Sequence, residues 1–225
     1  MSAEEFLTRA TEVGIDKLVG PVLGLALKGF LQKGTKALIQ ERLDEFFEEL
    51  RAEFTPALKD DYDHQFLQSQ DFAHLVLRAA DHAARARKRE RRALYARSLR
   101  NAATKRWGFP RCDLAEELLN MLAELSDIEI RVLNVSWAYL RKKKESVDES
   151  RGPLTNTVTA EDIAAELADV GLNEAELRAY LGKLQRFGLT QELVGAILSY
   201  SGGNFRLTPL LARLMDLIAD PRSYA

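Results

Sequence analysis

The sequence is poor in residues that cross-link a fold and in residues that break helices. It has one cysteine, Cys112, in 225 residues, which excludes an internal disulfide framework and any four-thiolate zinc site. A single cysteine also suits a reducing cytoplasm. Prolines number only six, whereas alanine, leucine and arginine are abundant, and this composition favours helix throughout the first half.

Sequence motifs of common enzyme classes are missing as well. The chain has no glycine-rich phosphate loop that opens a helix, no nucleophile elbow and no kinase-like set of residues. The three histidines, His64, His74 and His82, lack the i, i+4 pairing of a helical zinc site. We therefore predict a protein that is not an enzyme and that holds neither a metal nor another cofactor.

The N-terminal residues 1–5 include two acids, where a secretory signal peptide would be basic, and this predicts a cytoplasmic protein. The most apolar segment, residues 15–31, contains Asp16, Lys17 and Lys28, which are costly near the centre of a bilayer. Glycines within it would let another helix approach closely. The segment is interpreted as a buried helix of a bundle, with partner binding, self-association or triggered membrane insertion as alternatives.

The charge of the chain is strongly uneven, although the formal net charge is only −2. Between Arg85 and Arg111 lie eleven basic residues and one acid, Glu90. The segments on either side, residues 1–84 and 112–225, are both net acidic. A band this polarised predicts docking of a polyanion or of an acidic surface of the same protein.

A helix from about Arg87 to Thr104 carries most of this band, which we call the basic band (residues 85–111). Its arginines fall largely outside the apolar stripe of that helix. The candidate polyanion contacts here are Arg85, Lys88, Arg89, Arg92, Arg97 and Arg100. Phosphate neutralisation would make nucleic-acid binding steeply dependent on salt. The alternative is pairing with the acidic segments 41–53 and 57–63, which the charges match.

Helix boundaries are clearest after Leu125. Ser126–Glu129 forms a capping box, and residues 159–162 and 173–176 open two further helices, which Gly171 and Gly188 end. Residues 193–200 are rich in strand formers, residues 201–204 are typical of a hairpin turn, and Phe205–Leu207 return as a strand. Thr208 and Pro209 open a last helix that ends near Ile218.

This order predicts a winged helix-turn-helix domain, with a third strand at Val158. The predicted fold is mainly α: an N-terminal helical bundle over residues 1–125, and a C-terminal winged-helix domain with a small β-hairpin over residues 126–225. A DNA reader presents arginine, lysine, asparagine or glutamine near the start of its recognition helix. The helix at 174–187 instead starts with two glutamates, and its candidate contacts, with one on the wing, are Arg178, Lys183 and Arg206.

Two sequence patterns resemble a family of bacterial helical proteins of the abortive infection alpha type. Residues 94–102 match L-x-A-x-x-L-x-N-A, and residues 122–133 match L-x-x-L-S-x-x-E-x-x-V-L, within a similarity that spans about residues 65–135. The resemblance implies a bacterial intracellular protein with a role in phage defence and without known catalytic residues. The apolar segment lies outside that pattern, and the strong positive charge of the basic band is not a feature of it.

These observations predict a non-enzymatic interaction or regulatory protein that uses the winged helix as a protein-contact module. A nucleic-acid binder that uses the basic band and the wing is the first alternative. A membrane-active effector that uses residues 15–31 is the second.

Overall fold

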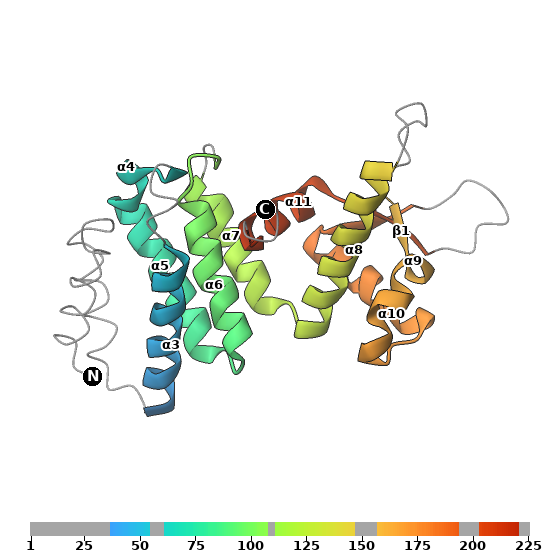
Figure 1. The fold of residues 1–225 in the computed structure, drawn as a ribbon, viewed down its shortest axis with the longest axis horizontal. Coiled ribbons are helices and arrows are strands. Elements are labelled where there is room, and N and C mark those ends of the chain that lie inside the picture. Colours follow the sequence, from blue (N-terminus) through green and yellow to red (C-terminus); the bar gives the residue numbers. More distant parts are fainter. Residues whose placement is uncertain (1–36, 55–60, 108–110, 147–156, 194–202, 221–225) are drawn as a thin grey trace. The chain divides into compact units, whose positions relative to one another are not determined.

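The chain forms two compact units (Figure 1). The computed structural model describes residues 37–54, 61–107, 111–146, 157–193 and 203–220. Among these, the residues up to Ala123 together with residues 217–220 form unit 1, and those within 124–216 form unit 2. The sequence predicted a division after Leu125 without a return of the chain. In the structure the chain re-enters unit 1 at Leu217.

Unit 1 is helical. Its helices are α3 (Ala37–Glu53), α4 (His64–Leu67), α5 (Gln70–Arg85), α6 (Arg89–Ala102) and α7 (Arg111–Glu124). Helices α3, α5 and α6 pack against one another (Figure 1). Phe46 of α3, Leu75 of α5 and Leu99 of α6 are fully buried. Burial of such side chains stabilises a fold by roughly 25 cal/mol per Å² of apolar surface.

Capping residues mark the starts of α4 and α5 in unit 1. The described part of residues 57–84 contains two helices because Ser69 starts a new one. The Ser69 hydroxyl accepts a hydrogen bond from the Phe72 N–H at 3.2 Å, which satisfies a donor that has no partner within the helix. Asp63 caps α4 in the same way, through the N–H groups of Gln65 and Phe66.

Unit 2 contains helices and a small sheet. Its elements are α8 (Asp127–Ser146), β1 (Thr157–Thr159), α9 (Ala160–Ala164), the 3₁₀ helix η2 (Ala165–Val170), α10 (Glu174–Lys183), the 3₁₀ helix η3 (Leu184–Phe187), β2 (Thr190–Glu192), β3 (Asn204–Leu207) and α11 (Pro209–Ile218). Capping boxes start α9 at Thr159 and α10 at Asn173. Gly171 ends η2 and Gly188 ends η3, and both glycines have a positive φ.

The sheet is antiparallel, in the order β1-β3-β2. Arg206 in the central strand lies opposite Thr157 of β1 and Gln191 of β2. Phe205 and Leu207 are buried, while Arg206 is exposed, so the side chains of β3 alternate between core and solvent.

The mainly helical character and the small sheet were predicted from the sequence. The position of the second strand differs: β2 begins at Thr190, three residues before the predicted start at Leu193. Its Thr-Gln-Glu sequence is not typical of a strand. It is held by pairing with β3, and by a hydrogen bond from the Thr190 hydroxyl to the Leu181 carbonyl at 2.8 Å.

Some predicted features lie outside the described residues. These are the apolar segment 15–31, most of the predicted strand 193–200 and the start of the hairpin turn at 201–202. Among the helices that the structure describes, none combines the length and the apolar character that a membrane crossing requires.

Two glycines of unit 2 predict opposite effects of the same substitution. Gly171 has a φ of +71° with open space around its Cβ position, so Gly171→Ala should lower the free energy of unfolding by about 1 kcal/mol through backbone strain. Gly182 lies inside α10, also with open space, so Gly182→Ala should raise it by up to about 1 kcal/mol. Urea unfolding measures both, and shifts of equal sign would contradict the assignment.

The capping box of α8 predicts a dependence of stability on pH. The buried Glu129 carboxylate accepts the Ser126 N–H at 2.7 Å, and the Ser126 hydroxyl accepts the Glu129 N–H at 3.2 Å. Burial raises the pKa of Glu129, but hydrogen bonds from Ser126 and the charges of Arg186 and Lys183 outweigh it, so the pKa lies below its ordinary value of 4.5.

A folded-state pKa below the ordinary value means that the ionised Glu129 stabilises the fold above pH 4.5 and loses this effect as the pH falls through the folded-state value. Glu129→Gln should therefore lower the free energy of unfolding by about 1 kcal/mol at pH 7, and by less in acid. Urea unfolding across this pH range measures the difference. Glu161→Gln, at an exposed position in the first turn of α9, serves as the control for loss of a carboxylate. A constant deficit in Glu129→Gln would refute this explanation.

Candidate functional site

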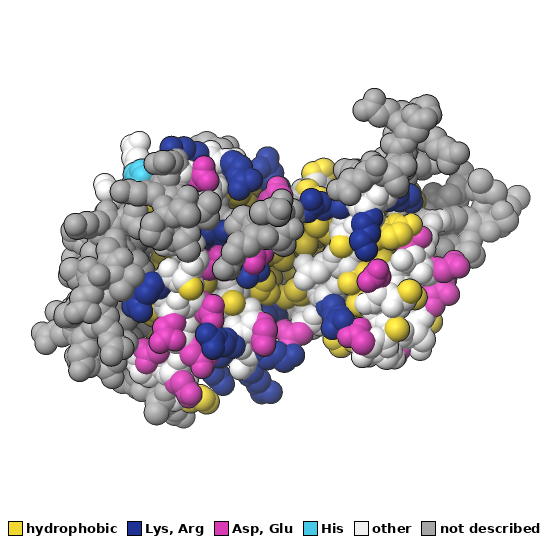
Figure 2. Space-filling model, viewed as in Figure 1, with side chains coloured by type: hydrophobic (Ala, Val, Ile, Leu, Met, Phe, Trp, Pro, Cys, Tyr) yellow, Lys and Arg dark blue, Asp and Glu magenta, His cyan; other side chains and the backbone are white. Residues whose placement is uncertain are grey.

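The basic band faces an acidic stripe on α3. Glu45, Glu49 and Glu53 are four residues apart, so they share one face of that helix. The ion pairs from α6 to this stripe join Arg92 to Glu45, Arg89 to Glu49 at 2.7 Å, and both Arg97 and Arg100 to Glu53 at 3.2 and 3.3 Å. Acidic and basic side chains accordingly lie interspersed over part of the visible face of unit 1 (Figure 2).

The predicted pairing with the acidic segment 57–63 also has a counterpart. Arg111, the last residue of the band, places its Nη1 2.8 Å from Oδ2 of Asp63. Its guanidinium carbon lies 4.7 Å from the centroid of the Phe66 ring. Hydrogen bonds from the Phe66 N–H and from Arg111 lower the pKa of Asp63 below its ordinary value. The band thus pairs with acids from both of the acidic segments that precede it in the sequence.

Burial separates the arginines of the band into two groups. The side chains of Arg92 and Arg100 are 5% and 3% exposed, whereas those of Arg85 and Arg89 are 75% and 65% exposed. An exposed ion pair contributes little to stability, because water and salt screen it. A buried charge that lost its partner would be strongly destabilising. The buried arginines therefore belong to the structure of unit 1.

Arginines of the band also bind the C-terminal ends of helices. Arg92 donates from Nη1 to the carbonyl of Ala86, the C-cap residue of α5, at 2.9 Å. Arg91 donates to the Leu122 carbonyl in the last turn of α7 at 3.1 Å. These carbonyls have no partner within their helices and lie at the negative end of the helix dipole. Positive charge from α6 supplies both the hydrogen bond and the complementary charge.

A third helix end, that of α11, is held by two adjacent residues of α6. Arg100 donates from Nη2 to the Ala219 carbonyl at 3.0 Å. Asn101 donates from Nδ2 to the carbonyls of Leu217 and Ala219, at 2.7 and 3.0 Å. All of these residues belong to unit 1. Asn101 was not predicted as a functional residue, although a polar residue on the buried side of a helix, near Leu99 and Ala102, is a signal for a specific hydrogen bond.

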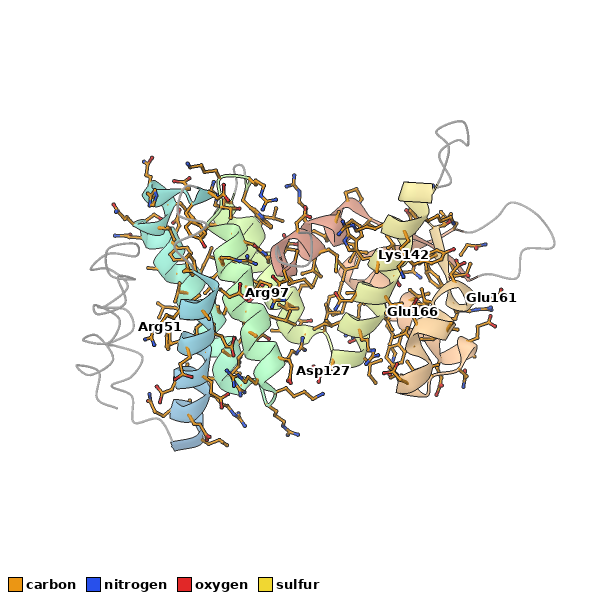
Figure 3. The ribbon with its side chains drawn as sticks, in the orientation of Figure 1. Arg51, Arg97, Asp127, Lys142, Glu161 and Glu166 are labelled. Atoms are coloured by element: carbon orange, nitrogen blue, oxygen red, sulfur yellow. The ribbon has the colours of Figure 1, made fainter. Side chains whose placement is uncertain are left out.

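Glu53 is the centre of the most buried charge cluster in the described chain. Its carboxylate, 6% exposed, pairs with Arg97 and Arg100, and Arg97 on α6 (Figure 3) also lies 3.8 Å from Asp220. Burial lowers the pKa of Arg100, an effect that Glu53 opposes. The same environment raises the pKa of the buried Tyr62 to about 12, mainly through loss of solvent. Two arginines and two carboxylates thus form a neutral cluster.

The remaining candidate contacts of the band lie near the turn between α5 and α6. Arg85 pairs with Asp81 one helical turn earlier, at 2.8 Å. Lys88 is exposed at the N-cap position of α6, where its side chain makes no capping hydrogen bond. Contact with a polyanion stays a prediction for these two and for Arg89. For Arg92 and Arg100 it would require the buried ion pairs to open.

The three candidate contacts of unit 2 are exposed, two of them on α10 and one on β3. Arg178 of α10 pairs with Glu174 at 3.1 Å. Nζ of Lys183 lies 4.6 Å from the centroid of the Tyr180 ring. Arg206 is the exposed centre of the sheet. Other exposed cations of this unit also pair with acids, as Lys142 of α8 does with Glu166 of η2 at 3.6 Å (Figure 3).

The N-terminal end of α10 carries negative charge. Asn173 and Glu176 bond to each other's backbone N–H groups at 3.0 and 2.9 Å, so both side chains are engaged in the capping box. Glu174 is exposed beside them. A phosphate that approached this helix end would therefore meet two carboxylates instead of free N–H groups.

Histidines and the cysteine do not converge on one site. His74 contacts Glu116 at 3.1 Å, and His82 contacts Asn120 at 2.9 Å. Within the described residues, no group of three or more histidine, cysteine or acidic side chains is placed to hold a metal ion. Burial and the nearby Asp71 raise the pKa of the Cys112 thiol to about 11, so it stays protonated and weakly nucleophilic near neutral pH.

Comparison of the chain with protein-family models, with curated proteins and with solved structures found no match. The resemblance to the abortive infection alpha family, drawn from residues 94–102 and 122–133, therefore stays a prediction.

The burial of the Glu53 cluster predicts unequal effects of two matched substitutions on α3. Glu53→Gln leaves Arg97 and Arg100 with a neutral partner in a buried site, so the free energy of unfolding should fall by about 3 kcal/mol or more. Glu49→Gln removes a carboxylate whose partner, Arg89, is largely exposed, so it should cause little change. Denaturant unfolding at constant pH and salt measures both, and equal losses would show that burial does not decide the effect.

Proposed function

We propose that this chain is a non-enzymatic interaction protein in which unit 2 is a winged helix-turn-helix module that contacts another protein through α10. The acidic, self-capped N-terminal end of α10 is the observation that carries the proposal. Unit 1 serves as the scaffold, because much of its basic band is engaged by α3 and by helix ends. A cytoplasmic location and a role in phage defence belong to the same proposal.

The order of elements in unit 2 supports the winged-helix assignment. Helix α8, strand β1, helices α9 and α10, and strands β2 and β3 follow one another, and the central strand β3 joins the other two. In this assignment α9 and α10 form the helix-turn-helix, with Gly171 in the turn. The segment between β2 and β3 is the wing, and α10 is the recognition helix.

The chemistry of α10 favours a protein partner over a DNA duplex. Direct reading of bases needs donors such as arginine, asparagine or glutamine near the start of the recognition helix. Here Asn173 is engaged in the capping box and Glu174 pairs with Arg178. Phosphate contacts supply most of the affinity for nucleic acid in general, and two carboxylates at this position oppose them. The exposed alanines Ala175 and Ala179 leave room for the side chains of a protein partner.

A nucleic-acid role has one specific observation in its favour. Arg206 is exposed at the centre of the sheet, in line with Thr157 and Gln191. Arg206 in unit 2 and, separately, the exposed Arg85 and Arg89 in unit 1 offer positive charge to a phosphate backbone. Membrane activity rests on residues 15–31, which lie outside the described residues, and it stays a sequence prediction.

Binding of the full chain to labelled duplex DNA and single-stranded RNA of random sequence, at 50 and 200 mM salt, separates these functions. The proposal expects dissociation constants no tighter than about 10⁻⁶ M. This value is the tight end of the range that is typical of non-specific binding at physiological salt. Tighter binding that weakens with salt, and that weakens further in Arg206→Ala, would replace the protein-contact proposal with the nucleic-acid one.

A photo-cross-linking amino acid at Ala179 tests the protein contact directly. We expect a discrete protein adduct in the cell of origin when the probe is at Ala179 of α10. The probe at the exposed Ala168 of η2 serves as the matched control in the same unit. Adducts of equal pattern from both positions would count against α10 as the contact surface.

A further inference from the structure

The C-terminal end of α11 is bound to α6 by hydrogen bonds to its backbone carbonyls. Asn101 bonds to the carbonyls of Leu217 and Ala219, and Arg100 bonds to that of Ala219. These oxygens are among the carbonyls that a helix leaves without an internal partner. The three bonds come from two consecutive residues of α6, Arg100 and Asn101, which are both buried. The positive charge of Arg100 lies at the negative end of the α11 dipole.

Side-chain contacts add to this attachment. Leu217 and Ile218 are buried, at 0% and 5% exposure. Asp220 lies 3.8 Å from Arg97, which also binds Glu53. Residues 217–220 are thus held through carbonyls, apolar side chains and one carboxylate, whereas the preceding residues of α11 belong to unit 2.

The attachment of residues 217–220 gives unit 2 a second connection to unit 1. The chain leaves unit 1 after Ala123 and re-enters it at Leu217, so the intervening residues form a loop that is closed by contacts of residues 217–220. Loss of these contacts would leave unit 2 joined to unit 1 by one covalent connection.

We propose that residues 217–220 form a releasable latch on α6, whose opening precedes the unfolding of unit 1 and frees one of the two chain connections of unit 2. Opening needs rupture of the bonds to Arg100 and Asn101, the Arg97–Asp220 contact and the apolar contacts of two side chains. The core of α3, α5 and α6 contributes none of the residues that detach. This inference does not depend on the proposed contact surface of α10.

Hydrogen exchange of the full chain, read by mass spectrometry, tests the latch. Asn101→Ala removes both of its bonds to the latch and keeps Glu53, Arg97 and Arg100. We expect amides in residues 212–220 to exchange at least about tenfold faster, which corresponds to ~1.4 kcal/mol. Amides of α3 and α10 should keep their wild-type rates.

A second variant and a control keep the test informative if Asn101→Ala impairs folding. Asp220→Asn weakens the latch from its own side and should accelerate the same amides to a smaller extent. Asn134→Ala, which alters an exposed asparagine of α8, should change none of them. Unchanged exchange in both latch variants, or equal acceleration across α3, α5 and the latch, would overturn the proposal. A concentration-dependent dimer whose latch residues are exchanged between two copies would also overturn it.

Discussion

The packing of the helices in unit 1 depends on the arginines of α6. Helix ends of α5, α7 and α11 direct unpaired carbonyl oxygens toward α6, and α3 turns a stripe of glutamates to the same helix. Each of these features brings negative charge or negative dipole ends into partly buried surroundings, where it needs a donor. Arginine meets this need well, because its planar group donates to several acceptors at once.

The cluster around Glu53 shows what this arrangement costs and requires. Taking charges out of water is unfavourable, and their attraction offsets it only when every charge is matched. Glu53 is shared by Arg97 and Arg100, and Asp220 supplies the second carboxylate. Part of the positive charge of the basic band, that of Arg92 and Arg100, is therefore buried within unit 1. The exposed part of the band consists of Arg85, Arg87, Lys88, Arg89, Lys105 and Arg106.

Helix ends are satisfied by side chains in unit 2 as well, but there the side chains are acidic and bind the N-terminal ends. One acid at the start of each of α8, α9 and α10 is engaged in a capping box, which fixes the helix start. Glu174 and Glu176 leave negative charge at the N-terminal end of α10. A helix end of this kind is a poor receptor for phosphate.

The sequence by itself determined where most helices of unit 2 begin and end, because capping boxes and left-handed glycines act over three or four residues. It also revealed that the basic band would meet either a polyanion or the acidic segments of the same chain. Only the tertiary structure decided between buried and exposed arginines, because long-range packing removes Arg92 and Arg100 from solvent and leaves Arg89 in it. The contact between Asn101 and residues 217–220 was likewise set by packing, since the carbonyls that Asn101 binds lie more than a hundred residues away in the chain.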